Sequence, residues 1–359
     1  MSFAGRGIVA LLLLLALGGI VGLVLGEDPA SEAGSDVVTV HDLSLLVCLV
    51  RSDAGQQALQ LTHDQRHDIA RLVDEVEYPL FLLRDQSLEA QREHAAAIKK
   101  QIDDSLHATL TVPQRERIAE LLLRAKGWPA VVSPANAVAL KLSSQQVAEM
   151  RRILAEAAAD KSFTGPALDK RISKLMTSEQ LSRLTQLIGE PFDLSRVPQV
   201  ACRAPELRDV SEWVNAQPHT LQSLRGQVVV LHFFAFGCIN CVNNQAHYKA
   251  WHERYANKGV TVLGVHTPET ERERDTAQLR ANVKAREIAY PIAVDSQASN
   301  WRAWSNNMWP SVYLIDKRGY VRYWWYGELN WQGAKGEELM RQRIDDLLAE
   351  DDGARAAPR

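Results

Sequence analysis

The hydrophobic pattern divides the chain into a helical middle and a later part in which strands alternate with helices. Through the middle, apolar residues recur three or four positions apart, as in Ile69, Leu72, Val73 and Val76. That spacing places them on one face of an α-helix. It predicts an all-α domain over residues 40–196.

Four of the predicted helices begin with the same short motif, an apolar residue followed by Thr or Ser with Gln three positions later. The motifs are Thr62 to Gln65, Thr111 to Gln114, Ser143 to Gln146 and Thr177 to Gln180. Such a pattern is a capping box, in which the two side chains satisfy backbone N–H groups at the helix start. The spacing between the motifs is irregular, which favours a divergent helical array or bundle over a strict solenoid.

After the middle region the apolar residues come in short runs typical of strands. The run from Val228 to Phe236 is rich in β-branched and aromatic residues and predicts a strand buried on both faces. Other strands are expected at 259–266, 290–294, 311–316 and 320–326, and helices at 242–258, 271–287, 300–308 and 337–350. This order predicts a mixed sheet with helices on both faces, over residues 213–350, after a linker at 197–212.

The first residues differ from both domains. Ile8 to Leu25 contains no charge and eight leucines, with Arg6 before it and acidic residues after it. It is typical of a signal peptide, cleaved near Gly26, or of a membrane anchor. Either alternative places the rest of the chain outside the cytoplasm, because the positive charge stays inside.

Composition adds few constraints. The 359 residues suffice for two domains, and the formal net charge of −3 gives no sign of nucleic-acid binding.

The candidate chemistry follows directly after the long buried strand. Gly237 ends the strand, and Cys238-Ile239-Asn240-Cys241 begins the next predicted helix. A cysteine at a helix N-terminus is stabilised as a thiolate by free N–H groups and the helix dipole. Cys241 lies one turn later on the same face. The pattern therefore predicts a redox-active disulfide, with Cys238 attacking and Cys241 resolving.

Two other uses of these cysteines are less consistent with the pattern. A zinc site needs a second ligand pair at suitable spacing, and Cys48 and Cys202 are isolated, so no metal and no separate cofactor is expected. A peroxidatic cysteine would need Pro and Thr or Ser where Leu231 and Ala235 stand. Cys48 and Cys202 themselves are either a structural disulfide or two separate thiols.

Several segments of the later domain resemble the extracytoplasmic thioredoxin-like family of TlpA, ResA and DipZ. They are the Cys238 to Cys241 motif, Gly264 to Glu269, Tyr290-Pro291 and Trp309 to Gly319. The resemblance implies a thioredoxin-like fold for this domain. The same helix starts found in the middle region also occur in small periplasmic stress chaperones.

The resemblance implies roles for individual residues. Cys238 matches the nucleophile, Cys241 the resolving thiol, and Pro310 the cis-proline that faces the dithiol. Trp309 is the best candidate for contact with substrate. His232 stands where relatives have a buried acidic or amide residue, and it is either a proton shuttle or a core histidine.

His266 and Glu269 match the family's motif at a strand end and are candidates for substrate binding. Together these features predict an extracytoplasmic thiol–disulfide oxidoreductase that acts on protein thiols or disulfides. A separate membrane-embedded protein is expected to donate electrons, and the helical domain to mediate dimerisation or docking. The alternative is an envelope scaffold or chaperone that uses the thioredoxin fold as an adaptor.

Overall fold

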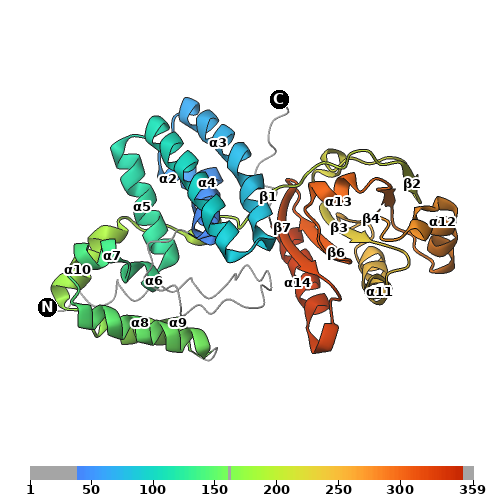
Figure 1. Cartoon of the computed structure of the whole chain (residues 1–359). Helices are drawn as coiled ribbons and strands as arrows, with labels where there is room; N and C mark the ends of the chain where they lie inside the picture. Colours follow the sequence, from blue (N-terminus) through green and yellow to red (C-terminus); the bar gives the residue numbers. More distant parts are fainter. Residues whose placement is uncertain (1–38, 161–162, 351–359) are drawn as a thin grey trace. The chain divides into compact units, whose positions relative to one another are not determined.

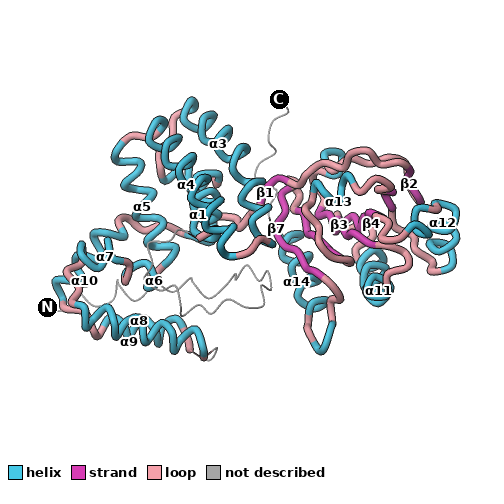
Figure 2. Tube along the Cα trace, in the orientation of Figure 1, coloured by secondary structure: helices cyan, strands magenta, loops and turns pink. Residues whose placement is uncertain are grey.

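The computed structural model describes residues 39–160 and 163–350, which belong to two compact units divided between Gln199 and Val200. The first unit consists of helices and loops, whereas the strands lie in the second (Figure 2). The apolar segment at residues 8–25 lies outside the described residues. Within the described ranges, no helix is long and apolar enough to cross a membrane.

The first unit confirms the predicted all-α region (Figure 1). Its helices are α1 (Val40–Arg51), α2 (Asp53–Ala58), α3 (His63–Leu82), α4 (Leu88–Thr109), α5 (Val112–Lys126), α6 (Trp128–Val131), α7 (Pro134–Ala139), α8 (Ser144–Ala159), α9 (Gly165–Ser173) and α10 (Ser178–Ile188), with 3-10 turns η1 (Leu83–Asp85) and η2 (Leu194–Arg196).

The four predicted capping boxes all form, at the starts of α3, α5, α8 and α10. Their glutamines also bond to one another across helices. The Gln65 amide donates to Gln114 Oε1 at 2.9 Å, and the Gln114 amide donates to Gln65 Oε1 at 3.0 Å. Gln146 and Gln180 form the same reciprocal pair, at 2.9 and 3.1 Å. The boxes therefore work in pairs, each joining two helix starts.

Each glutamine pair joins two helices that contribute to the same hydrophobic core, and the two pairs belong to different cores. One core collects buried residues between Leu43 and Ile118, and the other collects residues between Leu123 and Ile188. The helical unit is thus built from two packed modules in succession, each containing one pair of interlocked helix starts.

The second unit is a seven-stranded mixed sheet in the order β1-β7-β6-β3-β4-β5-β2. Its strands are β1 (Cys202–Arg203), β2 (Glu212–Val214), β3 (Val228–Phe234), β4 (Val260–His266), β5 (Ile292–Val294), β6 (Ser311–Ile315) and β7 (Tyr320–Tyr326). Its helices are α11 (Ile239–Arg254), α12 (Thr276–Ala285), α13 (Ser299–Ala303) and α14 (Gly336–Ala349), with 3-10 turns η3 (Gln222–Leu224), η4 (Glu271–Arg274) and η5 (Trp331–Gly333).

Strand β3 is central and buried along its whole length, as its apolar sequence predicts. It pairs in parallel with β4 and antiparallel with β6. Val230 and Phe234 share a core with residues of α11, α12 and α14. Phe233 points to the other face, where its ring lies 5.8 Å from that of Trp304 at the end of α13. Helices therefore cover both faces (Figure 1).

Two sequence-based boundaries need correction. Residues 200–212 are more than a linker, because β1 pairs with β7 and the second unit begins at Val200. The predicted helix at 271–287 is divided into η4 and α12, because Asp275 caps α12 by accepting bonds from the N–H groups of Ala277 and Gln278. This division creates a turn next to the dithiol.

Candidate active site

Cys238 occupies the N-cap position of α11, directly after the loop that leaves β3. Its sulfur accepts a hydrogen bond from the backbone N–H of Cys241 at 3.4 Å. Cys238 is half-buried, whereas Cys241 is buried under the first turn of the helix, and both are free thiols. The first thiol is thus open to a reaction partner and the second is shielded.

The two thiols have opposite pKa shifts. A hydrogen bond from the Cys241 thiol, helped by backbone N–H groups, lowers the pKa of Cys238 to about 7, although burial and the charge of Glu269 oppose this. Burial raises the pKa of Cys241 far above its usual range, and its bond to Cys238 adds to the rise. Near neutral pH about half of the Cys238 thiols are therefore ionised, whereas Cys241 stays protonated.

The peptide bond between Trp309 and Pro310 is cis, at the start of β6. The Trp309 indole N–H donates to the carbonyl of Thr267 at 3.2 Å, and its ring stacks on Trp301 at 3.8 Å. In the described part of the chain, neither the backbone N–H nor the carbonyl of Trp309 has a hydrogen-bond partner. These two groups are available to an extended peptide.

His232 lies in the middle of β3 and is buried, stacked on Tyr248 at 4.1 Å. Among the described residues, neither ring nitrogen has a hydrogen-bond partner. Burial lowers the pKa of His232 to about 3, so the imidazole is neutral at physiological pH. A neutral imidazole does not stabilise a thiolate by its charge, and the role of His232 as a neutral relay or in packing stays a prediction.

The structure separates the two residues expected at the end of β4. His266 is buried and stacks on Phe236 at 5.5 Å, and burial lowers its pKa to about 4. The expected contact of His266 with substrate needs correction, because the ring is covered. Glu269 is exposed, and its charge raises the pKa of both thiols. Its carboxylate therefore acts on the dithiol.

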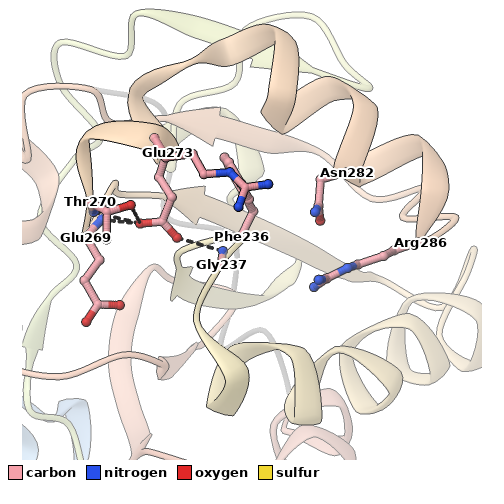
Figure 3. Close-up of a pocket in the computed structure, with 8 residues that line it drawn as sticks. Phe236, Gly237, Glu269, Thr270, Glu273, Asn282 and Arg286 are labelled. Atoms are coloured by element: carbon pink, nitrogen blue, oxygen red, sulfur yellow. Dashed lines mark hydrogen bonds between the residues drawn. The ribbon is translucent and has the colours of Figure 1, made fainter.

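Glu273, which sequence reasoning missed, is a buried carboxylate that ties two loops together. It accepts hydrogen bonds from the Gly237 N–H at 2.7 Å, the Glu269 N–H at 2.9 Å and the Thr270 N–H at 2.8 Å (Figure 3). The signal was the capping box formed by Thr270 and Glu273. The bond to Gly237 fixes the loop immediately before Cys238.

Cys48 is buried in the first unit and Cys202 is buried in the second. A disulfide between them stays a prediction. Within residues 39–160 and 163–350, no group of three or more His, Cys, Asp or Glu side chains is placed to hold a metal ion.

Residues 200–324 match the model of the AhpC/TSA family. Protein DipZ of Mycobacterium tuberculosis is 38% identical over 146 residues, which are 40% of this chain and 21% of DipZ. Thiol-disulfide oxidoreductase YkuV of Bacillus subtilis is 25% identical over 146 residues, which are 41% of this chain and 94% of YkuV. This chain thus spans about a fifth of the length of DipZ.

A solved structure, that of a thiol-disulfide isomerase from Corynebacterium glutamicum, is 28% identical, covers 41% of this chain and 98% of its own, and has a TM-score of 0.36. The family match falls on the unit that contains the dithiol and the cis-proline. The carboxyl-terminal part of this chain is a thioredoxin-like domain of the AhpC/TSA family, related to thiol–disulfide oxidoreductases.

Proposed function

We propose that this chain is an extracytoplasmic thiol–disulfide oxidoreductase in which Cys238 attacks and Cys241 resolves. The observation that carries the proposal is the asymmetry of the two thiols. Cys238 is accessible and has a pKa lowered to about 7, and Cys241 is shielded and protonated. A nucleophile with a pKa near the ambient pH combines a large thiolate fraction with good nucleophilicity.

Reduction of a substrate disulfide proceeds in two exchanges. The Cys238 thiolate attacks one substrate sulfur, the substrate S–S bond breaks, and the first substrate thiol leaves with a proton. Cys241 then loses its proton and attacks the Cys238 sulfur, which releases the second substrate thiol. The pair of electrons passes from the dithiol to the substrate, and a Cys238–Cys241 disulfide remains. Oxidation of a substrate dithiol is the same sequence in reverse.

The surroundings of Cys238 support a polypeptide as the substrate. An extended chain can bond to the N–H and carbonyl of Trp309 in the way that a strand adds to a sheet edge. Ile239, 68% exposed, follows Cys238 in the chain, and Met308, 44% exposed, precedes Trp309. Exposed apolar side chains favour contact with apolar residues of a protein substrate.

The location and the partners belong to the same proposal. The uncharged segment at residues 8–25 supports an extracytoplasmic position, either anchored or released by cleavage near residue 26. Electrons would then come from a separate membrane-embedded donor. The helical unit, with its two modules, is proposed to dimerise or to dock a partner. We expect a reporter enzyme that is active only outside the cytoplasm to be active when it is fused after Arg359.

The direct test is the rate at which the reduced protein cleaves a disulfide peptide at pH 7. Cys238→Ser should lower the rate at least about a hundredfold, because it removes the nucleophile. The matched variant Cys202→Ser, in the same unit, should keep the parental rate. A scaffold that only borrows this fold would react no faster than free cysteine, and Cys238→Ser would then change nothing.

A further inference from the structure

A pocket of about 520 Å³ lies next to the dithiol, and neither the sequence nor the proposed reaction accounts for it. Phe236 and Gly237, which immediately precede Cys238, form one wall. Asn282 of α12 and Arg286 just after it form the opposite wall (Figure 3). Because Gly237 directly precedes Cys238, the pocket borders the loop that leads to the reactive sulfur.

The pocket presents hydrogen-bond donors that have no partner in the protein. Within the described residues, the Arg286 guanidinium and the Asn282 side-chain amide form no hydrogen bond and no ion pair. Arg272, which also lines the pocket, bonds to Gln278 through Nε at 3.0 Å and keeps its terminal N–H groups unused. Two guanidinium groups with unused N–H groups in one pocket favour an anionic ligand.

Among the described residues, the two acidic residues of the pocket form no ion pair with these arginines. The Glu273 carboxylate is buried and already accepts three backbone N–H groups and the Thr270 hydroxyl. The Glu269 side chain points away from Arg286 in Figure 3, and its charge acts on Cys238. The anion-binding capacity of Arg286 and Arg272 is therefore left for a ligand.

We propose that this pocket binds a carboxylate of the disulfide substrate, one or two residues from the sulfur that Cys238 attacks. The proposal rests on the proposed oxidoreductase function and names the class of substrate it prefers. Guanidinium groups match the planar geometry of a carboxylate and can bond to both of its oxygens. The carboxylate comes from an Asp or Glu side chain of a protein, or from a small disulfide such as glutathione disulfide.

The test uses two symmetric peptide disulfides that differ in one charged group, acetyl-Cys-Glu-Ala-amide and acetyl-Cys-Gln-Ala-amide. The rate constant for their reduction by the full-length reduced protein is measured at pH 7 and low salt. We expect the Glu peptide to react about fivefold to tenfold faster, the gain from one partly exposed charge-assisted hydrogen bond. Glutathione disulfide, measured in parallel, distinguishes a small disulfide from a protein as the source of the carboxylate.

Variants distinguish the effect of binding in the pocket from attraction by the general charge of the protein. Arg286→Gln should abolish the preference for the Glu peptide, because it removes a guanidinium group from the pocket. Lys284→Gln, which removes an exposed positive charge from the same helix outside the pocket, should retain the preference. In the parent, 1 M salt should erase the preference, since the screening length falls to about 3 Å. This last measurement requires no variant to fold.

Equal rates for the two peptides in the parent would overturn the proposal while leaving the oxidoreductase function intact. A preference that survives Arg286→Gln would also overturn it. If the parent reduces neither peptide, the proposed function itself fails. If the acidic peptide is preferred and glutathione disulfide is reduced slowly, the carboxylate belongs to a protein substrate. If glutathione disulfide is reduced fast and Arg286→Gln slows its reduction, the small molecule is the source.

Discussion

The two sulfurs of the dithiol differ because Cys238 caps a helix, whereas Cys241 lies on the buried side of its first turn. The thiolate is the reactive form, and its fraction rises with pH through the pKa of about 7. We therefore expect the rate of Cys238 alkylation by iodoacetamide to rise about tenfold from pH 6 to pH 8 and then to level. Cys241, whose pKa is raised by burial, should react slowly over this whole range.

Mass spectrometry of the alkylated peptides measures both sites in one sample. Preferential labelling of Cys241 at pH 6 would reverse the assignment of nucleophile and resolving thiol.

A second prediction at this scale concerns His232, for which the sequence left two alternatives, a proton shuttle and a core histidine. A protonated histidine beside the dithiol would stabilise the thiolate, but burial lowers the pKa of His232 to about 3. His232→Asn should therefore leave the titration of Cys238 unchanged between pH 5 and pH 9. If the variant raised the pKa of Cys238, the imidazole would be charged in the native protein, contrary to the structure.

A third prediction concerns Glu273, which holds the loop before Cys238. Glu273→Gln places an amide N–H₂ among backbone donors and should lower the free energy of unfolding by about 1–3 kcal/mol. Gly237→Ala should disturb the same contact, because its Cβ would lie 2.7 Å from Glu273 Oε1. Urea denaturation measures both effects. Glu271→Gln, on the exposed side of the same turn, should change stability by less than about 0.5 kcal/mol.

Among the elements, the paired capping boxes give the helical unit a feature that can be measured. Gln65 and Gln114 share two hydrogen bonds, so removal of either residue loses both. Gln65→Ala and Gln114→Ala should each cost about 1–3 kcal/mol, and the double variant should cost less than their sum.

The control is a pair drawn from different modules, Gln65→Ala with Gln146→Ala. These residues share no partner, so their effects should add to within about 0.5 kcal/mol. Additive effects for Gln65 and Gln114 would show that the reciprocal bonds contribute nothing.

The elements also differ in how well the sequence predicts them. The buried strand β3 and the capped helices follow from long, regular patterns of apolar and polar residues. Strands β1 and β2 contain only two and three residues, too few for any periodicity, and exist because neighbouring strands offer free edges. The pocket residue Asn282 lies in α12 and Arg286 directly follows it, and only the fold brings them opposite Gly237.

At the scale of the molecule, the division into two units predicts that the second folds alone. A fragment of residues 200–350 should keep its sheet and the low pKa of Cys238. A fragment of residues 213–350, the boundary suggested by the sequence, should be less stable. It loses the pairing of β1 with β7 and the Glu206 carboxylate, which accepts the N–H groups of Leu221 and Gln222 at 2.6 and 3.0 Å.

Thermal unfolding followed by circular dichroism compares the two fragments. Equal melting temperatures would mean that residues 200–212 act as a linker after all.

The central claim is that Cys238 exchanges disulfides and Cys241 completes the exchange. It is tested most directly by mixing the reduced Cys241→Ser protein with the disulfide peptide and identifying the product by mass spectrometry. The account predicts one peptide joined to Cys238 and retained, whereas the reduced parent ends as a Cys238–Cys241 disulfide with the peptide released. The account would be contradicted if the peptide were joined to another cysteine. It would also be contradicted if the variant formed no adduct and the parent formed no disulfide.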